Sequence, residues 1–258
     1  MVYEMHKESS RYPAFKIPIV LVPASIDNNL PGSEFSIGTD TALNWNTETI
    51  DRIRQSASAS RRCFVVETMG RKCGYLALMS ALTTGAEQVY LYEDGITLSQ
   101  LAADTQKMIR SFEAGRQLYL VVRNEDASEY YNADVLANIF EEEGGDLFDV
   151  RSLLIGHAQQ GGNPSPFDRT LAVRLVNTAM TVLDRELAGK GGSYHVGMVD
   201  GHIEAQPVAH MDELIDMEDR LPFEPWWHPL KEVLYVVSDP TADLELAQLP
   251  IVIDGAES

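Results

Sequence analysis

Residues 17–32 read Ile17-Pro18-Ile19-Val20-Leu21-Val22-Pro23-Ala24-Ser25-Ile26-Asp27-Asn28-Asn29-Leu30-Pro31-Gly32. The apolar run 17–22 predicts a buried strand. The loop that follows it carries one carboxylate, Asp27. In open α/β sheets, ligands bind beyond the carboxyl ends of the strands, so Asp27 is a candidate catalytic group. An Asp-Asn-Asn loop is also an ordinary turn, and both interpretations of Asp27 stay open at this point.

Two further apolar runs end in loops of the same kind. The first loop is Glu67-Thr68-Met69-Gly70-Arg71, and the second is Gly156-His157-Ala158-Gln159-Gln160-Gly161-Gly162. Carboxyl ends of parallel strands meet at one edge of a sheet. We therefore predict a site where the three loops meet.

Strand and helix patterns alternate along most of the chain, which predicts an α/β fold with mostly parallel sheet and helices on both faces. The other predicted strands are 63–67, 88–92, 117–122 and 152–155. The predicted helices are 39–58, 75–84, 98–114, 133–143, 170–188, 212–219 and 230–237. Gly85 is placed to end one helix. The pair Asp200-Gly201 predicts a hairpin turn between two short strands within 194–208.

Composition limits the possible partners. The 258 residues include 39 acidic and 20 basic side chains, a net charge of −19. So negative a chain is not expected to bind nucleic acid or an anionic membrane. No apolar run reaches membrane-spanning length, and the two cysteines match no disulfide framework or zinc spacing. We expect a soluble, cytoplasmic protein.

The positions of the arginines are informative in such an acidic chain. A site for an anion must gather the few basic residues that the chain has. We expect Arg62, Arg71 and Arg151 to point to one end of the sheet.

Three long motifs, in residues 23–44, 66–77 and 156–169, resemble 6-phosphofructokinase. The resemblance runs in order from about Ile17 to Val237. It implies two interleaved Rossmann-like lobes and a glycolytic kinase, active with Mg²⁺, that transfers a phosphoryl group to the 1-hydroxyl of fructose 6-phosphate. The donor is ATP, or pyrophosphate in one branch. Ala24 favours the ATP branch, because the other branch typically carries lysine there. The resemblance also implies a cytoplasmic, allosteric homo-oligomer.

The resemblance implies roles for single residues. Asp27 resembles the base that takes the proton of the sugar hydroxyl, and Arg71 the arginine that stabilises the transferred phosphoryl group. Arg62, which would reach a neighbouring subunit's site, resembles a 6-phosphate ligand, as do Arg151 and His157. The full set resembling substrate or effector ligands is Ser25, Asn29, Arg62, Met69, Gly70, Glu125, Arg151, His157, Gln160 and Arg220. We assign no metal ligand.

Two positions depart from the catalytic pattern. Asn29 stands where active halves carry a second aspartate associated with the metal, and Gln160 where they carry an arginine. Both are typical of the carboxy-terminal half of the fused eukaryotic enzymes, which is regulatory and binds fructose 2,6-bisphosphate. Asp27 and Arg71 instead favour an enzyme. Three hypotheses remain: a sugar-phosphate-binding part of an ATP-dependent 6-phosphofructokinase, a non-catalytic regulatory module, and a remnant that does not fold on its own and binds no ligand.

The nucleotide site is a further departure. The family binds ATP phosphates with two Gly-Gly-Asp segments located before the first strand, and we expect neither in this chain. Activity of the chain alone is therefore not implied, and we interpret it as a fragment or a piece of a larger phosphofructokinase. The predicted domains are an incomplete first lobe (1–38 and 156–208), a second lobe (39–155 and 209–237) and a tail (238–258).

Overall fold

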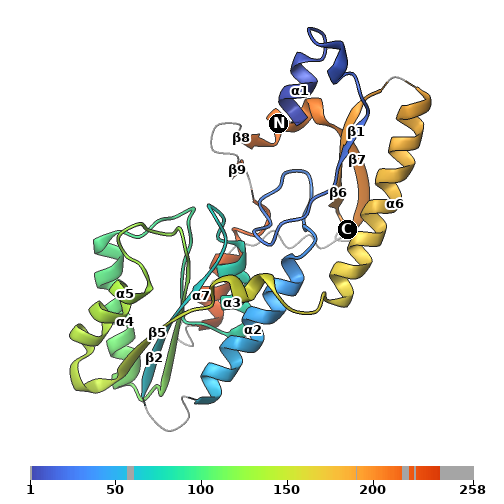
Figure 1. Cartoon of the computed structure of the whole chain (residues 1–258). Coiled ribbons are helices and arrows are strands. Elements are labelled where there is room, and N and C mark those ends of the chain that lie inside the picture. Colours follow the sequence, from blue (N-terminus) through green and yellow to red (C-terminus); the bar gives the residue numbers. More distant parts are fainter. Residues whose placement is uncertain (1, 57–60, 190, 217–220, 224, 239–258) are drawn as a thin grey trace, which may run out of the picture.

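The computed structural model describes residues 2–56, 61–189, 191–216, 221–223 and 225–238. Its elements form two lobes that lie side by side (Figure 1). The larger lobe holds a four-stranded sheet of order β3-β4-β2-β5, and the smaller a three-stranded sheet of order β1-β6-β7. No helix in the described part of the chain has the length and apolar character needed to cross a membrane.

The strands of the larger lobe are all parallel. They are β2 (Arg62–Thr68), β3 (Gln88–Tyr90), β4 (Leu118–Asn124) and β5 (Asp149–Leu154). One face is covered by α4 (Leu98–Glu113) and α5 (Ala133–Gly144), and the other by α2 (Thr39–Ser56), α3 (Tyr75–Thr84) and α7 (Leu230–Ser238) (Figure 1). Because helices cover both faces of the sheet, the ends of its strands are the part that the helices leave uncovered.

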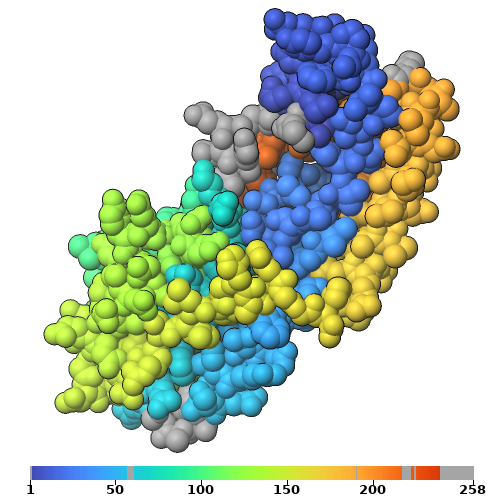
Figure 2. Space-filling model, viewed as in Figure 1, coloured from blue at the N-terminus to red at the C-terminus, as the bar shows by residue number. Residues whose placement is uncertain are grey.

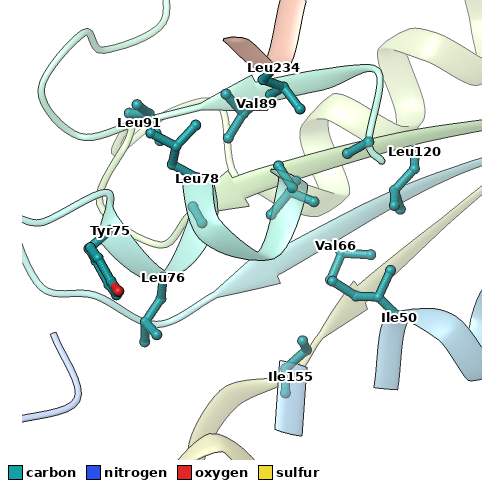
Figure 3. Close-up of a cluster of buried hydrophobic side chains, with 14 of the residues drawn as sticks. Ile50, Val66, Tyr75, Leu76, Leu78, Val89, Leu91, Leu120, Ile155 and Leu234 are labelled. Atoms are coloured by element: carbon teal, nitrogen blue, oxygen red, sulfur yellow. The ribbon is translucent and has the colours of Figure 1, made fainter. Parts of the chain in front are cut away.

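Alternation along the strands divides the core into two clusters. Val66 of β2 and Leu120 of β4 face α2 and α3, where Ile50, Leu78 and Leu234 join them (Figure 3). Intervening strand residues such as Val65 face α4 and α5. Because successive side chains in a strand point to opposite faces, continuous apolar runs are what a sheet buried on both sides requires.

The smaller lobe combines parallel and antiparallel pairing. Strand β1 (Ile19–Leu21) runs parallel to β6 (Ser193–Val199), which forms an antiparallel hairpin with β7 (His202–Pro207). The long helix α6 (Pro166–Ala188) packs on this sheet through Leu171 and Leu175 (Figure 1). The remaining elements are α1 (Val2–Glu8), the 3₁₀ helices η1 (Pro13–Phe15), η2 (Gly145–Leu147), η3 (Gly156–Gln160) and η4 (Val208–Glu213), and the pair β8 (Ile215–Asp216) and β9 (Leu221–Pro222).

Most sequence-predicted elements are confirmed. Helix α3 has the predicted bounds and ends at Gly85 in the left-handed conformation (φ 65°). The hairpin turn is confirmed too, since Asp200 and Gly201 both have positive φ. The helix predicted at 212–219 is wrong as far as it is described, because η4 ends at Glu213 and β8 follows. Helix α1 was not predicted, and the tail from 239 lies outside the described residues.

Candidate active site

The three predicted loops meet at one cavity of about 420 Å³. It lies where the loop after β1 approaches the carboxyl ends of β2 and β4. Figure 2 shows the segment around residue 160, in yellow, lying across the surface between the two lobes. The lining residues are Ala24, Ser25, Ile26, Asp27, Ile37, Met69, Arg71, Glu125 and Gln160. The cavity therefore collects six of the twelve residues selected from the sequence, namely Ser25, Asp27, Met69, Arg71, Glu125 and Gln160.

The segment Met69–Gly74 follows β2 and carries Arg71, and we call it the arginine loop. Five of its six backbone amides donate a hydrogen bond to a protein acceptor. The acceptors are Gln159 Oε1 for Met69 N (3.3 Å), Glu125 Oε1 for Gly70 N (3.2 Å), Asp126 Oδ2 for Lys72 N (3.1 Å), Gly70 O for Cys73 N (3.1 Å) and Glu93 Oε1 for Gly74 N (3.0 Å). Side chains from three other parts of the chain thus fix the path of this loop.

Asp27 is half-buried in the cavity wall. Its backbone N–H donates to Ser25 Oγ (3.3 Å). Burial raises the pKa of Asp27, and Asp126 raises it further, whereas the backbone N–H and the side-chain charge of Arg71 oppose the shift. A carboxylate destabilised in this way is a better proton acceptor than an exposed one.

The residue after Asp27 explains how the loop holds its shape. Asn28 is buried and takes the left-handed conformation (φ 56°), which asparagine tolerates better than most residues. Its Nδ2 donates to Glu34 O (2.8 Å) and its Oδ1 accepts from Ser36 N (2.8 Å). Asn28 therefore closes the loop behind the catalytic candidate. Asn29, which was selected from the sequence, does not line the cavity.

Glu125 enters the cavity from the loop after β4. Its backbone N–H donates to Thr68 O (2.9 Å), and its carbonyl accepts from Arg123 Nη2 (3.2 Å). Arg123 is buried and forms an ion pair with Glu67 of β2. Burial raises the pKa of Glu125, and the neighbouring carboxylates of Asp126 and Asp27 add to the shift. The site is therefore acidic around Arg71.

The third loop contributes exposed polar groups. Helix η3 carries His157 and Gln160, and His157 Nδ1 lies 3.3 Å from Gln160 Oε1. Gln160 lines the cavity, whereas His157 does not. Buried Gln159 ties η3 to the arginine loop through its bond with Met69 N.

The three arginines do not gather at one end of the sheet, so that expectation is wrong. Arg62 is the first residue of β2, whereas Arg71 follows the last. At about 3.3 Å per residue, β2 separates its two ends by roughly 20 Å. Arg151 is exposed on β5, in register with Phe64. Arg220 lies outside the described residues.

Several residues at the site were not selected from the sequence, in particular Asn28, Asn124, Asp126 and Asp168. Asn124 is the last residue of the buried strand β4, and Asp126 follows Glu125 in the next loop. Polar residues at the end of a buried strand were the sequence signal that could have indicated them. Asp168 accepts from Gly38 N and from Thr41 N (2.8 Å each) at the amino end of α2. It thereby anchors α2, on the cavity side, to α6 of the other lobe.

The described residues do not fit a complete nucleotide and metal site. No group of three or more His, Cys, Asp or Glu side chains among them is arranged to hold a metal ion. Phosphate cradles use several available backbone amides, and five of the six in the arginine loop already have acceptors. One Gly-Gly-Asp does occur, contrary to expectation, at Gly144–Asp146. It ends α5 and precedes β5, at the sheet end away from the cavity.

Comparisons with known proteins agree with this geometry. A family model described as phosphofructokinase matches residues 1–183. The chain is 38% identical over 255 residues to the platelet-type ATP-dependent 6-phosphofructokinases of Mus musculus and Homo sapiens, covering 95% of this chain and 32% of each relative. It is 36% identical over 257 residues to the muscle type of Equus caballus, covering 95% of this chain and 33% of that relative. The chain thus spans about a third of the length of the curated relatives it matches.

Solved structures show the same likeness. Phosphofructokinase of Pichia pastoris in the T-state superposes with a TM-score of 0.83 at 31% identity, covering 92% of this chain and 29% of that one. The Saccharomyces cerevisiae structure gives 0.81 at 32% identity, covering 92% and 34%. The predicted fold class is confirmed.

Proposed function

The chain belongs to the phosphofructokinase family, and on that premise we propose that its cavity binds a sugar phosphate as part of an ATP-dependent 6-phosphofructokinase. The observation that carries the proposal is that Asp27, Arg71 and Glu125 line one cavity. A base and a cation therefore lie at the same site, and the charge of Arg71 opposes the rise in the pKa of Asp27. Phosphoryl transfer depends mainly on such positioning and charge stabilisation.

The roles follow from the chemistry of each group. Asp27 takes the proton from the 1-hydroxyl of fructose 6-phosphate, and exposed Arg71 stabilises the charge on the transferred phosphoryl group. Glu125 accepts hydrogen bonds from sugar hydroxyls beside Met69. The 6-phosphate goes to the face near Gln160 and His157. Because no group of three or more His, Cys, Asp or Glu side chains among the described residues is arranged to hold a metal ion, Mg²⁺ and the ATP that binds with it would be held by parts of a phosphofructokinase outside them.

A second candidate function is a regulatory site for fructose 2,6-bisphosphate in a glycolytic, cytoplasmic oligomer. Gln160 favours this candidate, because a neutral amide lines the cavity where a catalytic site carries an arginine. Asn29 favours it too, because a neutral asparagine stands where active halves carry an aspartate associated with the metal. In this case sugar binding acts through contacts between subunits rather than through turnover.

The test is a thermal-unfolding titration with fructose 6-phosphate and, separately, fructose 2,6-bisphosphate. A ligand that binds the folded state alone stabilises it by about 2.7 kcal/mol at a hundredfold excess over its Kd. A larger shift with fructose 6-phosphate supports the enzyme, and a larger shift with the bisphosphate supports the regulatory site. Unphosphorylated fructose is the control. A cooperative transition that neither sugar phosphate moves would contradict both candidates.

Turnover needs its own variant. With ATP and Mg²⁺ supplied in a full-length phosphofructokinase, Asp27→Ser should abolish phosphoryl transfer while fructose 6-phosphate still binds. Unchanged turnover in this variant would remove Asp27 from the catalytic role and leave the regulatory candidate.

A further inference from the structure

Asn124, the last residue of β4, holds the arginine loop through hydrogen bonds to its backbone. It is fully buried, and its Nδ2 donates to two carbonyls of that loop, Gly70 O (2.7 Å) and Cys73 O (2.9 Å). Its Oδ1 accepts from Asp126 N (3.0 Å) in the loop that carries Glu125. A single amide therefore joins the loop of Arg71 to the loop of Glu125.

The conformation that Asn124 holds is a demanding one. Gly70 has φ 132°, and a Cβ added to it would lie 2.8 Å from Asn124 Nδ2. Lys72, which is not a glycine, has φ 52°. Backbone in such sparsely populated regions persists only when its surroundings hold it there. The two hydrogen bonds that Asn124 donates, to Gly70 O and Cys73 O, close the turn that contains Gly70 and Lys72.

The chemistry at this position requires an amide. Five of the six loop amides have protein acceptors, and three of these acceptors are the carboxylates of Glu125, Asp126 and Glu93. Asn124 instead supplies donors to the loop carbonyls, and its amide does not titrate. A carboxylate here would place negative charge against two carbonyl oxygens.

We propose that Asn124 is a positioning residue: it holds the arginine loop so that the Arg71 side chain faces the phosphoryl group on the sugar hydroxyl beside Asp27. The inference rests on the proposed function. Arg71 projects from the loop and is exposed, so its placement depends on the backbone that carries it. Glu125 depends less on Asn124, because Thr68 O and Arg123 hold its backbone.

This difference predicts that the loss of Asn124 weakens the binding of two sugar probes unequally. We call the ratio of the two increases in Kd the split. In Asn124→Ala, the Kd for fructose 1,6-bisphosphate, whose 1-phosphate would lie at Arg71, should rise about tenfold more than the Kd for fructose 6-phosphate. Tenfold is the scale of one lost hydrogen bond to a charged group. In an Arg71→Ala background, Asn124→Ala should add no further split, because the side chain that it positions is gone.

The matched control is Asn46→Ala. Asn46 is equally buried and its Nδ2 donates to Ser80 Oγ (3.2 Å), but it joins α2 to α3 and does not touch the arginine loop. It should destabilise the chain without changing the ratio of the two Kd values. An equal loss for both sugars in Asn124→Ala, or the same split in Asn46→Ala, would overturn the inference.

Asn124→Asp is the second variant, for the case that Asn124→Ala does not fold. It has the shape of asparagine but can donate only when protonated, so its split should shrink as the pH falls. A split that does not change with pH would count against the inference. If the unsubstituted chain binds neither sugar, the proposed function fails and the inference with it. If it binds both and no variant changes the ratio, the inference alone fails.

Discussion

At the scale of single residues, the candidate site is a set of carboxylates held close together by backbone amides. Glu125 accepts the N–H of Gly70 in the arginine loop, and burial raises the pKa of both Asp27 and Glu125. The charge of Asp27 raises the pKa of Glu125 further. Hydrogen bonds offset part of the free-energy cost of ionising these carboxylates. The part that is not offset makes a carboxylate a stronger acceptor for a proton or a cation.

A pH-dependent gain in stability should follow from replacing Asp27. Because its pKa is raised in the folded state, the folded chain holds the proton more strongly than the unfolded chain, and stability falls as the pH rises through the folded-state pKa. Asp27→Asn keeps the shape of the side chain and removes the charge. It should therefore raise the midpoint of urea unfolding at pH 8 and change it little at pH 4.

The exposed carboxylate of Glu129 provides the control. Glu129→Gln should change the free energy of unfolding by less than about 0.5 kcal/mol at both pH values, as surface substitutions usually do. An Asp27→Asn variant that is less stable than the parent at pH 8 would show that the carboxylate stabilises the loop in its charged form.

At the scale of elements, the junction between α6 and α2 connects the two lobes beside the cavity. Asp168 of α6 is buried and accepts from Gly38 N and Thr41 N at the start of α2. A carboxylate at a helix amino terminus satisfies amides that lack helical partners and meets the positive end of the helix dipole. Ile37, next to the first of these amides, lines the cavity. The junction thus supports one wall of the site.

Removing this carboxylate should cost more than removing an ordinary cap. Asp168→Ala loses a cap and leaves buried amides without acceptors, so we expect about 2 kcal/mol less stability in urea unfolding. The matched control is Asn132→Ala, which removes the cap of α5 (Val135 N to Asn132 Oδ1, 2.9 Å) and should cost about 1 kcal/mol. Equal costs for both would mean that the junction contributes nothing beyond capping.

Much of the fold is predictable from sequence because local patterns determine its elements. An apolar run closed by Gly85 defines α3, and Asp200-Gly201 defines the hairpin. The helix predicted at 212–219 was wrong, because apolar spacing in so short a segment does not distinguish an α-helix from the 3₁₀ helix and short strand that form there.

The site was predictable in part for a similar reason. Asp27 follows β1 and Arg71 follows β2, and the loops after these strands, which belong to two different sheets, line the same cavity. Asn124 and Asp168 act through hydrogen bonds to loops distant in sequence, and no local pattern reveals those partners. Arg62 was misplaced because it is the first residue of β2, whereas Arg71 follows the last.

At the scale of the whole molecule, aromatic contacts tie the lobes together. Phe35 packs against Phe167 of α6 (ring centroids 5.2 Å apart) and against Trp226 (5.5 Å), which also contacts Tyr75 of α3 (6.2 Å). Trp227 is 2% exposed in the core of the larger lobe. Since the cavity also takes residues from both lobes, ligand binding and lobe packing should reinforce each other.

One molecule cannot bring its own Arg62 to its own cavity, because the two lie at opposite ends of β2. If Arg62 binds the 6-phosphate, as the family resemblance implies, it must do so in a second copy of the chain. Arg62→Ala and Glu125→Ala should then each weaken fructose 6-phosphate binding on their own. Mixing them should restore a fraction of sites, because a mixed pair has one cavity with an intact Glu125 and a partner with an intact Arg62. Random two-fold pairing predicts recovery of roughly a quarter of the sites.

Isothermal titration of the mixture measures that fraction directly. Glu125→Ala mixed with itself at the same total concentration is the control, and it should recover no sites. Dilution should also weaken binding by the unsubstituted chain, because the site is complete only in the assembled form. If the mixture recovers no sites while each variant alone binds poorly, then Arg62 acts on the fold of its own chain and not on a neighbour's ligand.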